Sequence, residues 1–200
     1  MKTLLQINTS LHSDQGQSSV LASEFVEKWR QSNPDGRVIV RDLAANPPAH
    51  LTAERFQAFL TPPAERTPVQ AAYAEESDEL IRELQSADAV VIGLPMYNFG
   101  IPSTLKAWID HVARAGITFK YTENGPVGLL ADRPVWLFAA RGGTYRNTPR
   151  DTQSAYMTHF LNFIGIRDIE FVYAEGLNLG AETRRRSLDG ARQSIDRIAA

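Results

Sequence analysis

Apolar residues recur along this chain in two ways, as short continuous runs and at helical spacing. Ala89–Leu94 contains no polar side chain, which is typical of a buried strand, whereas Leu21, Phe25 and Trp29 recur every four residues, as on one face of a helix. The predicted strands are Thr3–Thr9, Arg37–Asp42, Ala89–Leu94, Pro134–Ala140 and Ile169–Ala174. The predicted helices are Ser18–Gln31, Thr52–Leu60, Thr67–Gln85, Ser103–Ala113, Asp151–Phe163 and Ala181–Ile198.

Strands and helices alternate along the whole chain, which predicts a parallel sheet with helices on both faces. Five such strands match the flavodoxin-like fold, a three-layer α/β/α arrangement with strand order 2-1-3-4-5. The charged ends of the second strand suit an edge of the sheet. Before the fourth strand, Ile117–Leu130 contains Asn124-Gly125-Pro126, which predicts an inserted hairpin.

Composition narrows the class of protein. The 200 residues are 43% hydrophobic, enough for one sizeable core, so we expect a single domain over residues 1–200. The net charge of −2 argues against nucleic acid or an anionic membrane as the main partner. The absence of cysteine excludes disulfides, cysteine-ligated metals and thiol catalysis. Apolar runs are too short for a membrane helix or a signal peptide, so we expect a cytoplasmic location.

The loop after the first strand, residues 9–19, combines hydroxyls, a glycine and the N-terminus of a helix. Backbone N–H groups in such a loop form a good site for a phosphate, although an ordinary polar loop with a serine cap is equally compatible. The G-x-x-x-x-G-K-[ST] pattern is missing, so this is not a Walker loop. His12 has no second histidine at metal-ligand spacing, so we expect no metal site and interpret His12 as a solvated loop residue.

Two further loops follow strands that are expected at the same crevice. Residues 94–103, LPMYNFGIPS, carry two aromatics, a methionine and an amide, which suit a flat, partly polar ring. An aromatic cluster that closes the core is the alternative. Residues 140–145, ARGGTY, contain paired glycines that let the backbone approach a ligand and point N–H groups at it, and a tight turn is the alternative. Together, the three loops predict a site for flavin mononucleotide (FMN).

The segment PMYNFGIPSTLKAWIDHVARAGITFKYTENGPVGLL resembles the FMN-dependent NADH:azoreductases, also called FMN-dependent NADH:quinone oxidoreductases. RDLAANP at 41–47, ARGG at 140–143, FLNFIGI at 160–166 and FVYAEG at 171–176 are also similar to this family, so the resemblance covers nearly the whole chain. It implies a flavodoxin-like fold, noncovalent FMN, a homodimer, and reduction of quinones and aromatic azo compounds by NADH.

The resemblance also implies which residues bind FMN. These are Ser10, Gly16, Gln17 and Ser18 for the ribityl phosphate, Met96, Tyr97, Asn98 and Phe99 for the isoalloxazine, and Ala140, Arg141, Gly142 and Gly143 for its pyrimidine side. Three positions depart from the family pattern: Gly16 and Ala140 stand where serine is common, and Tyr145 stands where a close relative has histidine. The first two departures leave the backbone N–H groups in place, so FMN binding should persist.

Substrate contacts are expected from aromatic residues. Tyr145 lies on the third loop, Tyr121 on the inserted segment and Phe163 at the end of the fifth helix. We expect Tyr121 and Phe163 to shape a pocket shared between the two chains of a dimer, where an apolar acceptor could stack on aromatic rings. Core packing is the alternative for these aromatics.

The expected chemistry needs little from side chains because the flavin carries the reactive centre. We expect ping-pong hydride transfer from NADH through bound FMN to a quinone or azo compound, with no catalytic side chain and with solvent as the proton source. N–H groups near Gly142 and Gly143 would stabilise negative charge on the reduced ring. The G-x-G-x-x-G fingerprint is absent, so NADH should bind over the flavin.

Two other classes of protein share this fold. A flavodoxin-type electron carrier would use the same cofactor without turning over small molecules, but it docks its partners through charge, which a net charge of −2 supports poorly. A phosphoacceptor domain needs clustered aspartates at the ends of strands 1 and 3. Those ends read Asn8-Thr9-Ser10 and Pro95-Met96-Tyr97, which argues against such a domain.

Overall fold

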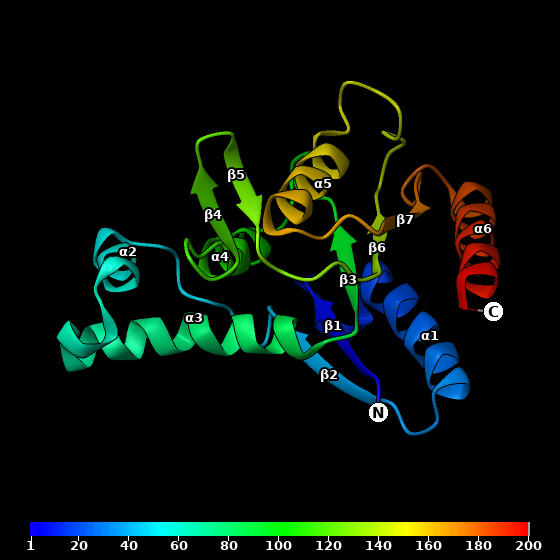
Figure 1. Cartoon of the computed structure of the whole chain (residues 1–200). Helices are drawn as coiled ribbons and strands as arrows, with labels where there is room; N and C mark the ends of the chain where they lie inside the picture. The colour runs from blue at the N-terminus through cyan, green and yellow to red at the C-terminus, as the bar shows by residue number, and fades with distance from the viewer. Residues whose placement is uncertain (200) are drawn as a thin grey trace.

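Five parallel strands form the central sheet of the computed structural model, which describes residues 1–199 (Figure 1). The strands are β1 (Thr3–Asn8), β2 (Arg37–Asp42), β3 (Ala89–Pro95), β6 (Val135–Ala140) and β7 (Ile169–Ala174). They lie in the order β2-β1-β3-β6-β7, and every neighbouring pair is parallel. The predicted flavodoxin-like order 2-1-3-4-5 is therefore confirmed, with β2 at an edge as its charged ends suggested.

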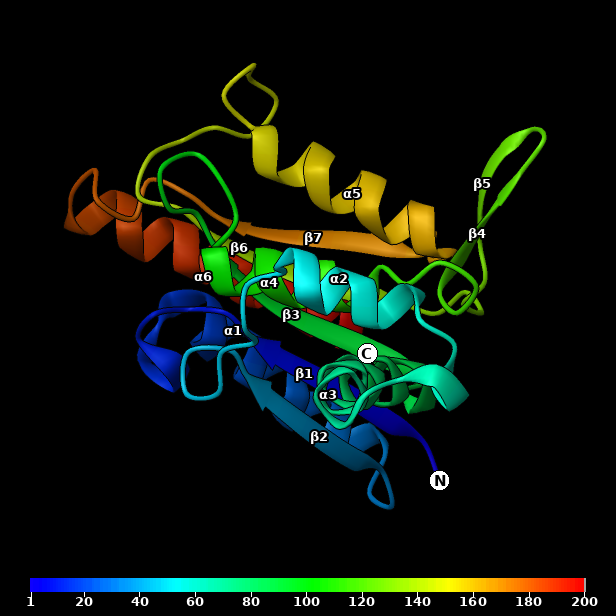
Figure 2. The same ribbon diagram turned by 90° about the vertical axis from the view of Figure 1, so that its left-hand side faces the viewer.

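Helices cover both faces of this sheet. They are α1 (Gln17–Ser32), α2 (Ala53–Leu60), α3 (Pro68–Ser86), α4 (Ser103–Val112), α5 (Thr152–Ile164) and α6 (Ala181–Ala199). Figure 2 shows α1 and α6 on one face and α3, α4 and α5 on the other, with α2 beside α3. The sheet therefore separates two buried cores: Leu4 and Val91 pack toward α1 and α6, and Leu5 and Ile92 toward α3, α4 and α5. Because neighbouring residues of a strand point to opposite faces, both must be apolar, which explains the continuous apolar runs.

Local side-chain signals define where helices begin and end. The Thr67 hydroxyl accepts a hydrogen bond from the Gln70 N–H at 3.3 Å, and the Gln70 side chain accepts one from the Thr67 N–H at 3.0 Å, which is a capping box at the start of α3. At the start of α5, the Asp151 carboxylate accepts from the Ser154 N–H at 3.1 Å. The same helix ends at Gly165, whose φ of 110° is left-handed.

The predicted hairpin consists of β4 (Phe119–Thr122) and β5 (Gly125–Gly128). The chain that leaves it runs past the end of α5, where the Leu130 N–H donates to the Ile164 carbonyl at 3.0 Å, and then enters β6. The hairpin therefore lies at the end of the sheet where the parallel strands begin. Figure 2 shows it projecting beyond this end, opposite the loops that follow β1, β3 and β6.

Those loops emerge side by side because their strands are neighbours. The Thr9 hydroxyl donates to the Gly93 carbonyl at 2.7 Å and so joins the end of β1 to β3. The chain order reverses between these two strands, and ligands of open parallel sheets bind outside the carboxyl ends at this point. Within residues 1–199, no helix is both long and apolar enough to cross a membrane.

Candidate functional site

A cavity of about 460 Å³ lies at the carboxyl ends of β3, β6 and β7. The residues that line it are Met96, Asn98, Phe99, Gly142, Gly143, Tyr145, Asn178 and Leu179. Six of these eight were predicted as site residues from the sequence, on two separate loops. The structure thus brings the loop after β3 and the loop after β6 together around one space.

The loop after β3 makes a tight turn that presents two side chains to this cavity. Tyr97 and Gly100 exchange backbone hydrogen bonds of 3.1 and 2.9 Å across the turn. Asn98 and Phe99 between them have φ values of 48° and 65°, in the left-handed region that non-glycine residues seldom adopt. Strain of this kind persists only where the surroundings hold it and is frequent at ligand sites. The turn leaves the Phe99 ring 52% exposed at the mouth of the cavity.

The loop after β6 presents backbone N–H groups. The carbonyls of Gly142 and Gly143 accept hydrogen bonds from the N–H groups of Asn178 and Gly176, at 3.0 and 2.9 Å. The N–H groups of the two glycines donate no hydrogen bond to any group in residues 1–199. A Cβ at Gly142 would lie 2.6 Å from the Asn178 amide nitrogen, so a side chain here would push the Asn178 side chain aside. Two adjacent donors are thus left for a ligand that accepts hydrogen bonds.

The loop after β1 lies beside the turn and does not line this cavity. The Tyr97 hydroxyl joins the two loops, since it accepts from the Leu11 N–H at 3.2 Å and lies 3.4 Å from the Ser10 hydroxyl. Gly16 stands directly before α1, and Gln17 and Ser18 form its first turn. The Ser18 hydroxyl is buried and has no hydrogen-bond partner within the described chain. The N-terminus of this 16-residue helix leaves its first backbone N–H groups without intrahelical partners, which fits an anionic group such as a phosphate.

On the loop after β6, Ala140 and Arg141 were also predicted as site residues, but they do not line this cavity. Ala140 is the last residue of β6, and its carbonyl accepts from the Met96 N–H at 3.2 Å. Arg141 was expected to face the ligand, but its side chain is fully buried in ion pairs with Asp151 and Glu175. Its N–H donates to the Ala174 carbonyl and its own carbonyl accepts from the Leu177 N–H, so its backbone is paired as well. Neither its side chain nor its paired backbone lines this cavity, because its main chain continues the sheet.

The three candidate substrate residues separate into two places. Tyr145 lines the cavity and makes an edge-to-face contact with Phe99, with ring centroids 5.7 Å apart. Tyr121 lies on the hairpin and Phe163 in the last turn of α5, both next to Phe119 at the opposite end of the sheet. Neither lines the cavity of its own chain. Tyr121 is 75% exposed, so core packing does not explain it.

Sequence reasoning missed Asn178 and Leu179. They follow the fifth strand, where no motif marks them, yet every loop at the carboxyl end of a parallel strand is a candidate. Residues 176–178 lie against residues 141–143 through three backbone hydrogen bonds of 2.9 to 3.1 Å. The only signal in the sequence for these two residues was that their loop follows the fifth strand.

Comparison with known proteins places this site in a family. The family model of the flavodoxin-like fold matches residues 1–199. An FMN-dependent NADH:quinone oxidoreductase of Cellvibrio japonicus is 61% identical over 180 residues, which cover 90% of each chain. The chain belongs to the FMN-dependent NADH:quinone oxidoreductase family. A Burkholderia lata member of this family is 51% identical over 195 residues, 98% of each chain.

Solved structures agree with this family membership. An azoreductase from Bacillus anthracis superposes with a TM-score of 0.90 at 27% identity and covers 100% of this chain and 99% of its own. An FMN-dependent NADH-azoreductase from the same species, solved in complex with FMN, has a TM-score of 0.87 at 29% identity and covers both chains fully.

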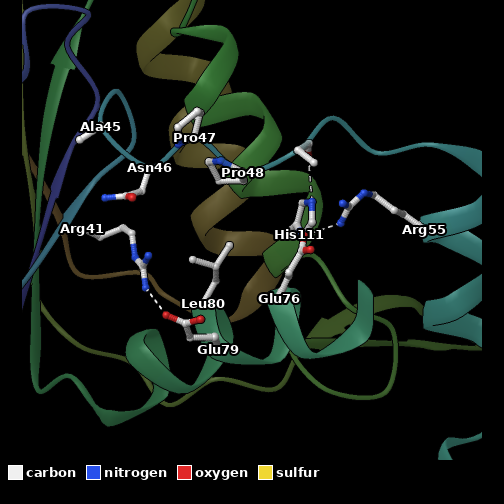
Figure 3. Close-up of a pocket in the computed structure, with 11 residues that line it drawn as sticks. Arg41, Ala45, Asn46, Pro47, Pro48, Arg55, Glu76, Glu79, Leu80 and His111 are labelled. Atoms are coloured by element: carbon white, nitrogen blue, oxygen red, sulfur yellow. Dashed lines mark hydrogen bonds and ion pairs between the residues drawn. The ribbon is translucent and has the colours of Figure 1, made fainter. Parts of the chain in front are cut away.

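This family member has a second cavity, of about 480 Å³, on the α3 and α4 side of the sheet (Figure 3). Its cations are already paired: Arg41 with Glu79 at 2.6 Å and Arg55 with Glu76 at 2.5 Å. His111 is fully buried there, and its Nε2 lies 2.9 Å from the Ala49 carbonyl. These contacts join β2 and α2 to α3, and the segment before α2 to α4, which is a structural role. We therefore place the candidate functional site at the first cavity, the glycine cavity, which Gly142 and Gly143 line.

The buried imidazole generates a prediction about pH. Burial lowers the pKa of His111 below its ordinary 6.5, and the nearby Arg55 lowers it further, against the opposing influence of Ala49, Glu76 and Asp110. The unfolded chain therefore takes up this proton at a higher pH than the folded one. Stability should be fully present above about pH 6.5 and should fall as the pH drops below it.

Thermal unfolding between pH 7.5 and 5.0 measures this effect. As the pH falls, the Tm of wild type should drop by about 2–4 °C for each ~1 kcal/mol that protonation of His111 removes from the free energy of unfolding. His111→Gln keeps a donor for the Ala49 carbonyl and should flatten the profile, whereas His159→Gln, on an exposed position of α5, should leave it as in wild type. An unchanged slope in His111→Gln would exclude His111 as its source.

Proposed function

We propose that this chain is an FMN-dependent NADH:quinone oxidoreductase that also cleaves aromatic azo compounds reductively to amines. The observation that carries the proposal is the pair of unengaged N–H groups at Gly142 and Gly143, which face Met96, Asn98 and Phe99 across one cavity. An acceptor-rich edge of a flat ring fits such donors, and apolar and aromatic side chains fit its faces. The names of the close relatives supply the donor and acceptor classes.

The residues divide by the part of FMN that each would hold. Ser10, Gly16, Gln17 and Ser18 would take the phosphate, since they lie at or beside the N-terminus of α1, where N–H groups lack intrahelical partners. Met96, Tyr97, Asn98 and Phe99 would line the isoalloxazine. Gly142 and Gly143 would bind its pyrimidine edge, with Asn178 as a further contact. Ala140 and Arg141 would act only through the position that they give to Gly142.

Bound FMN would supply the centre that accepts a hydride from NADH and delivers it to the acceptor. The chain's own part is to bind and orient. The N–H groups of Gly142 and Gly143 would stabilise negative charge at the ring edge without reorganising, because their carbonyls are already fixed. Among the lining residues only Tyr145 is titratable, so we assign no catalytic side chain and expect protons to come from solvent.

A single-electron carrier remains the rival function for this fold. It is disfavoured by the aromatic mouth formed by Phe99 and Tyr145, which suits the stacking of a planar small molecule. Multiple turnovers of NADH with a soluble quinone and no protein partner distinguish an enzyme from a carrier.

The first prediction concerns the cofactor. The purified protein should hold about one noncovalent FMN per chain and release it on denaturation. One per chain is expected because the donors of Gly142 and Gly143 line a single cavity. Asn98→Gly, which removes the amide but suits the φ of 48°, should weaken FMN binding by the ~1–3 kcal/mol expected when a buried partner is left unpaired. Asn98→Ala should weaken it at least as much, because alanine adds backbone strain.

Fluorescence titration of FMN measures these affinities. Asn162→Ala, on the exposed face of α5, is the matched control and should bind as wild type does. A colourless protein that binds no added FMN would overturn the proposal. If Asn98→Gly binds FMN as tightly as wild type does, Asn98 is not part of the site, but the rest of the proposal is unaffected.

The second prediction is ping-pong kinetics. One cavity serves both substrates, and no G-x-G-x-x-G loop offers NADH a place of its own, so donor and acceptor must bind in turn. Initial rates over a grid of NADH and quinone concentrations should give parallel double-reciprocal lines, with inhibition by excess NADH. Intersecting lines would mean a ternary complex and reject this mechanism. Azo dyes should be reduced more slowly than quinones.

The third prediction is a homodimer with shared sites. Because Tyr121 and Phe163 lie at the end of the sheet opposite the cavity, they can line only a cavity of a second copy. Tyr121→Ala and Phe163→Ala should raise the KM for the acceptor about two- to tenfold, as expected from the ~0.5–1.5 kcal/mol of an aromatic contact. The dissociation constant of FMN should change less.

Steady-state kinetics and light scattering on the same samples provide the measurement. Val127→Ala, also exposed on the hairpin, should keep the wild-type KM. A monomer with full activity would refute shared sites, whatever the two aromatic variants do.

A further inference from the structure

A buried polar cluster lies behind the wall of the proposed FMN cavity, centred on Arg141. The guanidinium is fully buried and has four hydrogen-bond acceptors. Nη2 donates to Asp151 at 2.8 Å and to the Ser154 hydroxyl at 2.9 Å, Nη1 donates to Glu175 at 3.0 Å, and Nε donates to the Gln153 side chain at 3.3 Å. Burial opposes ionisation of Asp151, but the hydrogen bonds from Arg141 and Ser154 outweigh it, so the pKa of this carboxyl lies below its ordinary value. Asp151 is therefore an anion at neutral pH.

Glu175 connects this cluster to the loop after β6. Besides accepting from Arg141, its Oε1 accepts from the N–H groups of Tyr145 and Arg146, at 2.9 and 3.0 Å. The carboxylate thus fixes the backbone directly after Gly142 and Gly143. It holds this wall of the cavity from behind.

Gln153 connects the same cluster to the turn after β3. Its side chain is buried, and its amide donates to the Pro95 carbonyl at 2.7 Å and to the Gly100 carbonyl at 3.3 Å. These two carbonyls flank the strained turn at Asn98 and Phe99. The neighbouring Thr152 hydroxyl also donates to the Phe99 carbonyl. The segment 151–154 therefore holds the opposite wall.

We propose that Arg141 is a positioning residue that fixes the two walls of the FMN cavity relative to each other, a role that rests on the proposed function. Its planar fork reaches acceptors on α5 and beyond the end of β7 at once, which a lysine ammonium cannot do. With Arg141 in place, the donors at Gly142 and Gly143 and the turn at Asn98 keep one separation. The ring then binds without reordering either loop.

A purely structural role is the alternative, and Arg114 provides the matched control. Its side chain is only 4% exposed, and its guanidinium donates to the Ser77 hydroxyl at 2.7 Å and to Asp78 at 3.2 Å. These partners lie on α3, and none of them lines the glycine cavity. Arg114→Lys and Arg141→Lys therefore both disturb a buried guanidinium, at different distances from the site.

The test compares the two holoproteins. Arg141→Lys should raise the dissociation constant of FMN about tenfold or more, as expected from loss of charge-assisted hydrogen bonds, and should shift the midpoint potential of the bound flavin. Arg114→Lys should lower Tm by a similar amount but leave the FMN constant and the potential unchanged. If the two variants differ from wild type only in Tm, the positioning role is wrong.

A double-mutant cycle tests the coupling of the walls directly. Gln153→Met breaks the link to the turn at similar volume, and Glu175→Gln keeps an acceptor for Tyr145 and Arg146 but removes the charge that pairs with Arg141. Gln153 and Glu175 share no hydrogen bond but both bond Arg141, so non-additivity in FMN dissociation that disappears in Arg141→Lys is carried by Arg141. We expect their effects to be less than multiplicative in wild type and multiplicative in Arg141→Lys.

The outcomes distinguish failure of this inference from failure of the proposed function. A wild-type protein that binds no FMN overturns the proposed function. A wild-type protein that binds FMN and turns over NADH, with multiplicative effects in both backgrounds, leaves the function standing and overturns the coupling.

Discussion

The common direction of β1, β3, β6 and β7 is the constraint on which the cavity depends. Parallel strands deliver all the loops that follow them to one end of the sheet, so segments far apart in the sequence share a single space. The backbone ladder continues to the floor of that space: the Met96 N–H donates to the Ala140 carbonyl, and the Arg141 N–H donates to the Ala174 carbonyl. Gly142 is the first residue of its loop whose N–H has no such partner.

Beyond the sheet, backbone carbonyls of these loops accept hydrogen bonds from within the chain, whereas several of the N–H groups donate none within residues 1–199. The carbonyls of Pro95, Phe99 and Gly100 accept from side chains at the start of α5, and those of Gly142 and Gly143 accept from residues 176–178. The N–H groups of Gly142 and Gly143, like those of Asn98 and Phe99 in the facing turn, donate no hydrogen bond within residues 1–199. Since these unpaired N–H groups lie beside one cavity, this pattern favours a ligand edge rich in acceptors over one rich in donors.

The layers of the fold were predictable from the sequence because periodicity reports which side of an element is buried. The loops were predictable in position but less so in detail. The place of Arg141 beside Gly142 does not reveal that its own backbone pairs with Ala174 and Leu177. Asn178 was missed because contacts between neighbouring loops depend on the sheet, and the separation of Tyr121 from the cavity likewise depends on the direction of the strands.

The departure from serine at position 16 has a spatial explanation in the same loop. A Cβ at Gly16 would lie 2.1 Å from the Ser10 hydroxyl oxygen, so the Ser10 hydroxyl already occupies the space that a side chain at position 16 would need. That hydroxyl accepts from the His12 N–H at 3.2 Å and lies 3.4 Å from the Tyr97 hydroxyl. The Ser10 Cβ would lie only 2.5 Å away as well, so rotation of the Ser10 hydroxyl would not make room. A serine at position 16 would require the loop itself to shift, and with it the contact that joins the first loop to the strained turn after β3. On this argument, Gly16 keeps a hydroxyl at the N-terminus of α1 by leaving room for Ser10.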